Sequence, residues 1–327
     1  MILVTGAAGF IGSNILACLE EAGLGPIAAC DWFESDTKWL NVAKREIAEF
    51  ISPENLLISL RRRQDVKAII HMGAISATTE RNVDLLIERN IQTTVNLWDY
   101  CAEANIPFIY ASSAATYGAL EHGLIDDERP EALATLRPLN AYGWSKKATD
   151  QILISRLAQK KKVPPQWVGL KFFNVYGPNE YHKGSMMSVV AKFFDPVRAG
   201  APVRLFKSDR DDIEHGEQKR DFIYVKDCSN AIVWLIQNPQ VSGIFNLGTG
   251  KARSFRDVVC AIGLAMNKSV NIEYVDMPAE LTGKYQYFTQ SEMEKFRLHG
   301  LPSDFHSVEL GVRDYVLNYL CKKDPYR

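Results

Sequence analysis

The chain opens with Met1-Ile-Leu-Val-Thr-Gly-Ala-Ala-Gly-Phe-Ile-Gly-Ser13, and we expect this stretch to decide the fold. Residues 2–4 are apolar and lack a polar face, as in a strand buried on both sides of a parallel sheet. Gly6, Gly9 and Gly12 follow at a spacing of three, and an apolar helical pattern comes next. In this order a strand, a glycine turn and a helix N-terminus form an anion site, because backbone N–H groups face a pyrophosphate and the missing Cβ atoms let it come close. The stretch therefore predicts a dinucleotide-binding site.

Composition narrows the class of protein. The 327 residues are long enough for a large core and two domains, and the net charge of −1 gives no general attraction to nucleic acid or to an anionic membrane. No apolar run reaches the length of a membrane span, and a first strand beginning at Ile2 leaves no room for a signal peptide. The six cysteines lie far apart without a Cys-x-x-Cys spacing, which indicates reduced, mostly buried thiols and no metal site. We expect a cytoplasmic protein with no nucleic-acid or membrane partner.

Two residues give opposite indications about the cofactor. A second apolar strand, Pro26–Cys30, ends in Asp31, about twenty residues past the glycine turn, where a carboxylate suits the ribose hydroxyls of NAD. Lys38 follows, and a cation there could neutralise the 2′-phosphate of NADP. The alternative for Lys38 is a solvated loop lysine, so the residues alone leave the choice open.

The next segments are predicted to complete a doubly wound sheet. Residues 43–64 have a charged helical pattern, and residues 66–70 form a strand that enters His71-Met-Gly-Ala74. Strand ends on this edge form the ligand crevice, so Gly73 and Ala74 are expected to let the cofactor pass close by. We expect His71 to be a strand-end histidine with its hydrogen bonds satisfied rather than a ligand.

The chemistry is predicted where the next strand, residues 108–112, ends. Ser112 and Ser113 place hydroxyls over the cofactor, and Tyr142 and Lys146 lie at i and i+4 on one helix face. A tyrosine base near neutrality needs its pKa lowered from about 10 to about 7, which corresponds to about 4 kcal/mol. One positive charge at ~4 Å supplies about that much at an effective dielectric of about 20. Lys146, helped by the positive nicotinamide ring, can therefore prepare Tyr142 as proton acceptor, with Ser113 bonded to the same substrate oxygen.

These features resemble the extended short-chain dehydrogenase/reductases that act on nucleotide sugars. The motifs are Thr5–Gly12, Ser112-Ser113 before Tyr117-Gly118, Tyr142-x-x-x-Lys146, Asn174-Val-Tyr-Gly-Pro178, Arg220–Val225 and Phe245–Gly250. Within that group the chain is most similar to the ADP-L-glycero-D-manno-heptose 6-epimerases. That likeness is carried by Ala111–Gly118, His182-Lys-Gly-Ser-Met186, Asp36-x-Lys38 and Gly283-Lys-Tyr-Gln-x-Phe-Thr289. The 4,6-dehydratases carry Asp-Glu where this chain has Ala114 and Ala115, and galactose-type 4-epimerases are not expected to carry the 182–186 stretch.

The resemblance implies an α/β architecture, a Rossmann-type doubly wound parallel sheet with a smaller C-terminal substrate-binding lobe. Residues 1–172, with a return segment at about 222–248, would bind NADP (NAD being possible), and residues 173–221 and 249–327 would form the lobe. The implied reaction is epimerisation at C6″ of ADP-D-glycero-β-D-manno-heptose through a transient keto intermediate with tightly bound NADP. The product would serve the inner core of lipopolysaccharide. The resemblance also implies a homo-oligomer, a homopentamer.

The resemblance assigns site residues as well. Lys183 alone would be interpreted as a phosphate-binding or solvated lysine, whereas the family gives it the role of second acid/base. The catalytic residues are then Tyr142, Lys183, Ser113 and Lys146. The cofactor residues are Gly6, Gly9, Phe10, Ile11, Gly12, Asp31, Trp32, Lys38, Met72, Gly73, Ala74, Ile75, Ser76, Asn90, Lys146, Val175 and Lys183. The substrate residues are Asn174, Lys183, Ser185, Lys192, Phe206, Lys207, Ser208, Asp209, Arg220 and Tyr285.

The C-terminal half carries further expectations. A helix should run from Ser185 to near Gly200, and Arg220, placed before a strand, suits a bidentate grip on a pyrophosphate. The alternative for Arg220 is a structural pair with Asp221 or Asp227. The polar run 207–219 is longer than the family's usual connection and is interpreted as a flap.

Two other functions remain open. One is a different nucleotide-sugar epimerase or reductase, such as a UDP-galactose 4-epimerase-like enzyme. The other is a non-catalytic dinucleotide sensor, which should have lost the Tyr142/Lys146 pair.

Overall fold

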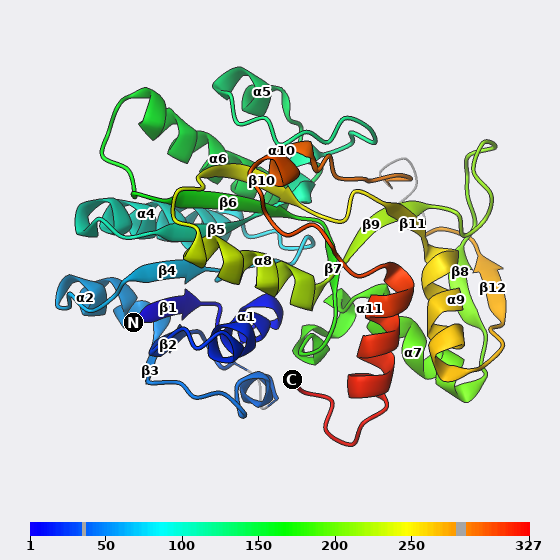
Figure 1. Ribbon diagram of the computed structural model, residues 1–327. Coiled ribbons are helices and arrows are strands. Elements are labelled where there is room, and N and C mark those ends of the chain that lie inside the picture. The colour runs from blue at the N-terminus through cyan, green and yellow to red at the C-terminus, as the bar shows by residue number, and fades with distance from the viewer. Residues whose placement is uncertain (35–36, 279–285) are drawn as a thin grey trace.

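The computed structural model describes residues 1–34, 37–278 and 286–327, and its largest element is a seven-stranded parallel sheet (Figure 1). The strand order is β10-β6-β5-β4-β1-β2-β3. The strands are β1 (Ile2–Thr5), β2 (Ile27–Cys30), β3 (Glu49–Ile51), β4 (Ala68–His71), β5 (Phe108–Ser113), β6 (Trp167–Phe172) and β10 (Gly243–Leu247). The order reverses direction at β1, which confirms the Rossmann-type doubly wound fold.

Helices cover both faces of this sheet. They are α1 (Phe10–Glu21), α2 (Leu56–Arg61), α3 (Val83–Leu86), α4 (Thr93–Ala104), α5 (Pro130–Thr135), α6 (Ala141–Ala158), α8 (Val225–Gln237) and α10 (Glu294–Leu298). The side chains of β1 alternate between the two layers, because Ile2 and Val4 pack with α1 and α8 whereas Leu3 packs with α4 and α6. This two-sided burial explains the apolar run that begins the sequence.

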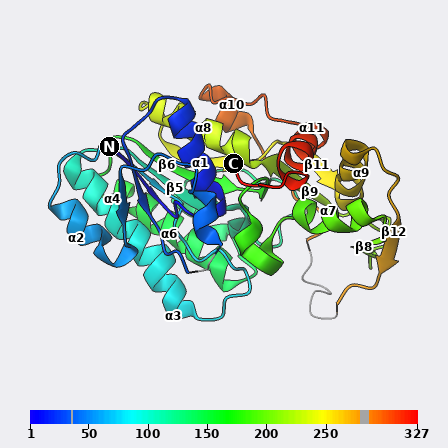
Figure 2. The ribbon, with the colours of Figure 1, turned by 90° about the horizontal axis from the view of Figure 1, so that it is seen from below.

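A second group of elements lies beside the main sheet (Figure 2). It contains a three-stranded sheet in the order β11-β9-β7 and a two-stranded sheet of β12 and β8. The strands are β7 (Asn174–Tyr176), β8 (Val203–Phe206), β9 (Lys219–Tyr224), β11 (Ala252–Ser254) and β12 (Ile272–Val275), and the helices are α7 (Val189–Ala199), α9 (Phe255–Met266) and α11 (Val308–Tyr315). These elements share their own apolar core.

Short helical segments connect the regular elements. They are the 3₁₀ segments η1 (Lys38–Asn41), η2 (Pro53–Asn55), η4 (Ala114–Tyr117) and η5 (Tyr181–Met186), and the π-helical segments η3 (Ile87–Gln92) and η6 (Val316–Leu320). None of the helices in the described part of the chain has both the length and the apolarity to cross a membrane.

Three local predictions were wrong. Residues 43–64 are not one helix, because 49–51 pair with β2 as the edge strand β3 and α2 begins only at Leu56. Ser185 lies in η5, and α7 starts at Val189 after the N-cap Ser188, whose hydroxyl accepts a hydrogen bond from the Ala191 N–H. Arg220 lies inside β9 rather than before it.

Candidate active site

The glycine loop is held in place by backbone packing. Gly6 has φ +64°, and a Cβ there would lie 2.6 Å from the Gly73 nitrogen. A Cβ on Gly12 would lie 2.0 Å from the Gly6 carbonyl oxygen, so both positions require glycine for the loop to fold onto itself and onto the end of β4. Helix α1 starts at Phe10 without a side-chain cap from Gly9 and without an acidic residue in its first turn. These features leave its first N–H groups suited to an anion such as the pyrophosphate of a dinucleotide.

Asp31 and Lys38 form one ion pair, although the sequence suggested that they act in opposition. The Lys38 Nζ lies 2.9 Å from Oδ1 of Asp31 and donates to the Trp32 carbonyl at 2.6 Å. The same carboxylate accepts from the backbone N–H groups of Ala8 (2.9 Å) and Trp32 (2.8 Å). Asp31 is thereby joined to the glycine loop, and Lys38 is a partner of Asp31 rather than a solvated loop lysine.

Trp32 is surrounded by charged side chains that the sequence analysis did not single out. The Arg89 guanidinium lies 4.1 Å from the centre of the Trp32 ring, and the indole N–H donates to the Glu54 carboxylate. Arg89 directly precedes Asn90 in the sequence, so it could have been found as a charged residue next to a predicted cofactor position.

Asn90, which lies in η3, holds the segment after β4 in place through hydrogen bonds. Its Oδ1 accepts from the Ile75 N–H at 2.8 Å, and its Nδ2 donates to the Ile75 carbonyl and to the Ser145 hydroxyl, each at 3.0 Å. Asn90 therefore shapes the predicted cofactor segment Met72–Ser76 through Ile75 and joins it to α6.

His71 is a buried histidine with both ring nitrogens satisfied, as expected. Nδ1 lies 2.6 Å from the Thr5 hydroxyl, and Nε2 lies 3.0 Å from the Thr94 hydroxyl. Burial, together with the nearby Lys146, lowers the pKa of the His71 ring to about 3. The ring is therefore neutral at physiological pH, and the prediction that it is no ligand fits this arrangement.

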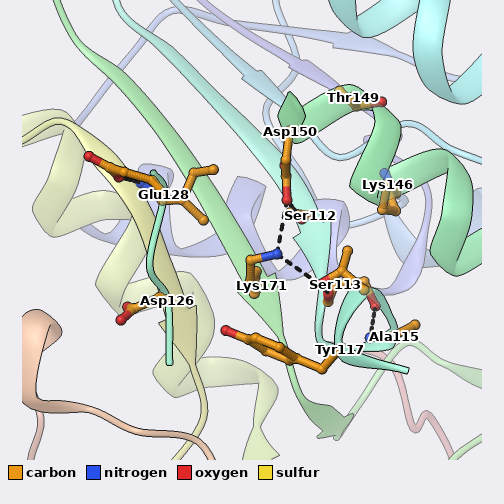
Figure 3. Close-up of polar contacts among 12 residues, drawn as sticks. Ser112, Ser113, Ala115, Tyr117, Asp126, Glu128, Lys146, Thr149, Asp150 and Lys171 are labelled. Atoms are coloured by element: carbon orange, nitrogen blue, oxygen red, sulfur yellow. Dashed lines mark hydrogen bonds and ion pairs between the residues drawn. The ribbon is translucent and has the colours of Figure 1, made fainter. Parts of the chain in front are cut away.

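Ser113, Tyr142 and Lys146 come from two neighbouring elements. Ser113 is the last residue of β5, and α6 carries both other residues. Figure 3 shows Ser113 and Lys146 on these two elements. Helix α6 begins there because the Asn140 side chain accepts from the Gly143 N–H at 2.8 Å. The Lys146 Nζ donates to the Ala111 carbonyl at 2.7 Å.

The electrostatics of Tyr142 differ from the sequence-based expectation. Burial raises the pKa of the Tyr142 hydroxyl above its usual value, and a hydrogen bond with Ser113 opposes this rise. Burial also lowers the pKa of Lys146 to about 8, with the Asp150 carboxylate opposing. In the protein alone, desolvation dominates the shift in the pKa of the phenol, so Tyr142 is not a base at neutral pH.

Lys183 lies at the glycine loop. It belongs to η5, and its Nζ is 5.2 Å from the centre of the Phe10 ring at the start of α1. Burial lowers the pKa of Lys183, and the Glu180 carboxylate opposes that change. The Glu180 carboxylate is fully buried and accepts from the Ser188 hydroxyl at 2.7 Å and from the Gly177 N–H at 3.3 Å, which closes the loop that carries Lys183.

The predicted substrate residues are spread over the second group of elements. Asn174, Ser185 and Lys192 are exposed and Phe206 is half-buried, as is the neighbouring Val175, which was predicted to bind the cofactor. Lys207 pairs with Asp276 at 2.9 Å, the Ser208 hydroxyl donates to the Arg210 carbonyl at 3.0 Å, and the Asp209 carboxylate bonds the Tyr287 hydroxyl. Tyr285 lies outside the described residues.

The run 207–219 contacts the loop that follows η4. The Arg210 guanidinium lies 3.0 Å from the Glu121 carboxylate, which also accepts from the Tyr287 N–H at 3.0 Å. In this structure the run therefore contacts the loop that follows η4. Its role as a flap stays a prediction.

Arg220 lies over the Phe255 ring at 5.7 Å and donates to the Lys219 carbonyl at 2.8 Å. The carboxylates considered as its partners bind other groups. Asp221 accepts from Thr249, Gly250 and Ser291, and Asp227 accepts from His306.

Residues 2–248 match the model of the NAD dependent epimerase/dehydratase family. The chain belongs to this family. Over the whole of both chains it is 46% identical, across 335 aligned residues, to an ADP-L-glycero-D-manno-heptose-6-epimerase of Fusobacterium nucleatum. The family resemblance seen in the motifs, to the heptose 6-epimerases, is thereby confirmed.

Solved structures of epimerases share the fold. The crystal structure of the Helicobacter pylori ADP-L-glycero-D-manno-heptose-6-epimerase superposes with a TM-score of 0.79 at 28% identity, covering 97% of this chain and 95% of the other. A UDP-glucose 4-epimerase of Thermus thermophilus in complex with NAD has a TM-score of 0.73 at 26% identity, covering 95% and 97%.

Proposed function

We propose that this epimerase converts ADP-D-glycero-β-D-manno-heptose into ADP-L-glycero-β-D-manno-heptose by inverting C6″ through a transient ketone. The observation that carries the proposal is 46% identity over the full length to a heptose 6-epimerase. It is supported by Ser113 and Tyr142 on neighbouring elements and by Lys183 beside the glycine loop.

We propose NADP as the tightly bound cofactor, although the T. thermophilus neighbour holds NAD. The glycine loop and the N-terminus of α1 would bind its pyrophosphate, and Asp31 with Lys38 would face the adenosine ribose. Because Lys38 neutralises Asp31, the carboxylate repels a 2′-phosphate less than a solitary carboxylate would. A nicotinamide bound there would supply reversible hydride transfer at C6″, so the reaction would have no net redox change.

The side chains of this chain would handle the proton. Tyr142 takes the proton of the C6″ hydroxyl, with the Ser113 hydroxyl bonded to the same oxygen and Lys146 stabilising the phenolate. After the keto sugar has turned, Lys183 donates a proton to that oxygen from the other side. One proton is removed and one is returned, which balances the reaction. The lowered pKa of Lys183 suits a donor that must exchange its proton.

We further propose that the substrate lies against residues 173–221 and 249–327, with Arg220 at the pyrophosphate. The other predicted substrate contacts, Asn174, Ser185, Lys192, Phe206–Asp209 and Tyr285, remain part of this proposal. We also propose that the cofactor domain ends at residue 172 and has a return segment at 222–248. We further propose a homopentamer located in the cytoplasm, whose product is used in lipopolysaccharide.

The test starts with the purified protein. We expect it to release NADP on denaturation, identified by mass and absorbance, and to convert ADP-D-glycero-D-manno-heptose without added cofactor. UDP-galactose serves as the comparison substrate. Release of NAD with conversion of the heptose would overturn the cofactor proposal alone. Conversion of UDP-galactose with an untouched heptose would overturn the substrate proposal in favour of a 4-epimerase.

A further inference from the structure

A buried ion pair adjoins Ser113 and Lys146 in Figure 3. The Nζ of Lys171, on β6, lies 3.0 Å from Oδ2 of Asp150, on α6, and the two side chains are 1% and 0% exposed. Neither residue was predicted as part of the site. Removing two charges from water is costly, and well-packed apolar residues often replace such a pair without loss of stability. Stability alone is therefore a weak reason for this pair to exist.

Asp150 fastens α6 to β5. Its Oδ2 accepts from the Ser112 hydroxyl at 2.7 Å, and its Oδ1 accepts from the Tyr110 hydroxyl at 3.1 Å. One helical turn earlier, Lys146 donates to the carbonyl of Ala111, the residue between them. Side chains one turn apart on α6 thus hold three consecutive residues of β5. A sliding of the helix along the strand would break all of these contacts together.

Lys171 extends the same contacts to η4, the segment that follows Ser113. Its Nζ donates to the Thr116 hydroxyl at 2.7 Å, and that hydroxyl donates to the Ser113 carbonyl at 2.8 Å. The ammonium also lies 5.1 Å from the centre of the Tyr117 ring. The ion pair is therefore connected to the backbone of Ser113 through a single side chain.

We propose that Asp150 and Lys171 are positioning residues, which hold β5, α6 and η4 in one register so that Ser113 and Tyr142 meet the same substrate oxygen with Lys146 beside them. This inference rests on the proposed function in that it assigns the chemistry to these three side chains. The Asp150 carboxylate also affects the pKa of Lys146. Lys146 is faced by the Asp150 carboxylate and by the neutral His71, and burial lowers its pKa to about 8 while Asp150 opposes.

The test needs a variant that separates folding from positioning. Asp150→Asn or Lys171→Met alone leaves one buried charge unpaired, which destabilises the fold for a trivial reason. The double variant Asp150→Asn/Lys171→Met removes both charges and keeps an acceptor for Ser112 or Tyr110. Lys171→Arg is the conservative control, because it retains the ion pair.

For the double variant we expect a melting temperature and a bound-cofactor content close to those of the wild type, but a kcat on ADP-heptose about 100-fold lower, as for a misplacement of roughly 1 Å. KM should stay within about twofold, because most of the proposed substrate contacts lie at residues 173–221 and 249–327. The single variant Lys171→Arg should retain most of the wild-type kcat. A folded double variant with wild-type kcat would overturn the proposal, and so would one that does not fold, because the pair would then serve the fold itself.

A crystal structure of the double variant tests the positioning role of Asp150 and Lys171 without any substrate. We expect the 2.7 Å contact from Lys146 to the Ala111 carbonyl to be lost and Ser113 to be displaced. Unchanged positions of Ser113, Tyr142 and Lys146 would overturn the positioning role. If the wild type leaves ADP-heptose untouched, the proposed function fails by itself, and this structural comparison still tests the inference.

Discussion

The ammonium of Lys38 lies 2.9 Å from the carboxylate of Asp31, and both side chains are largely buried, at 14% and 7% exposed. The carboxylate that would favour NAD is therefore neutralised by the cation that would favour NADP. Because Asp31 also accepts the Ala8 N–H, the pair is anchored to the glycine loop rather than lying free beside it. We therefore expect cofactor preference to depend on the pair as a unit.

Replacing Lys38 by Ala is expected to shift cofactor preference toward NAD. The unpaired Asp31 carboxylate would repel a 2′-phosphate, and loss of a charged hydrogen bond of about 1.5–3 kcal/mol corresponds to roughly 10- to 100-fold in affinity. The measurement is the ratio of NADP to NAD released from the purified variant. Lys44→Ala is the control, since its ion pair with Asp324 is exposed. An unchanged ratio would show that Lys38 has no part in the choice.

The contrast between Asp31 and Lys38 shows what local sequence can predict. The strand, the glycine turn and Asp31 follow one another at fixed intervals, so they can be predicted from the sequence without knowledge of tertiary contacts. Tyr142 and Lys146 are likewise fixed by helical spacing. Lys38 is the first residue of η1, and no strand or helix spacing relates it to Asp31, so only the folded chain shows that the two charges meet.

Tertiary pairing explains the larger errors. Residues 43–64 have helical spacing of apolar side chains, yet Glu49–Ile51 pair with Ala28–Cys30 as an edge strand, and sheet pairing overrides local propensity. Asp150 and Lys171 lie on different elements, so their ion pair leaves no pattern in the sequence. The raised pKa of Tyr142 also depends on burial, which residue spacing does not predict.

Replacing Gly12 by Ala should abolish cofactor binding and weaken the fold. The added Cβ would lie 2.0 Å from the Gly6 carbonyl oxygen, which forces the loop off the start of α1. Thermal unfolding and the cofactor content of the purified variant provide the measurement. Gly23→Ala is the matched control, because its Cβ meets open space and its φ of +67° costs only about 1–2 kcal/mol. If both variants lose cofactor equally, crowding at the loop is not the cause.

The lowered pKa of His71 should make the free energy of unfolding depend on pH. Its folded pKa, about 3, lies below its unfolded value of about 6.5, so between these values the unfolded chain binds the extra proton. The free energy of unfolding should therefore fall as pH falls from about 6.5 toward 3, by up to roughly 5 kcal/mol from this residue. Urea unfolding of His71→Gln should show a shallower loss than the wild type over that range.

The control for this titration is His122→Gln, which removes an exposed histidine and should leave the wild-type pH dependence unchanged. Parallel curves for the wild type and His71→Gln would contradict the assignment, since the acid sensitivity would then come from other groups.

The two acid/base residues make separable predictions. Tyr142→Phe and Lys183→Met should each lower kcat by about 10²- to 10⁴-fold, the usual contribution of a general acid or base, with the fold and the bound cofactor retained. In the proposed mechanism Tyr142 is needed to form the ketone, whereas Lys183 is needed after the sugar has turned. Lys183→Met should therefore still exchange the C6″ hydride with the cofactor while failing to invert that carbon. Absorbance of the reduced nicotinamide after addition of ADP-heptose tests this, together with recovery of the sugar in its original configuration. Lys161→Met, at an exposed lysine beyond α6, is the control. Inversion at the wild-type rate by Lys183→Met would remove Lys183 from the reaction and leave Tyr142 as the acid/base on both faces.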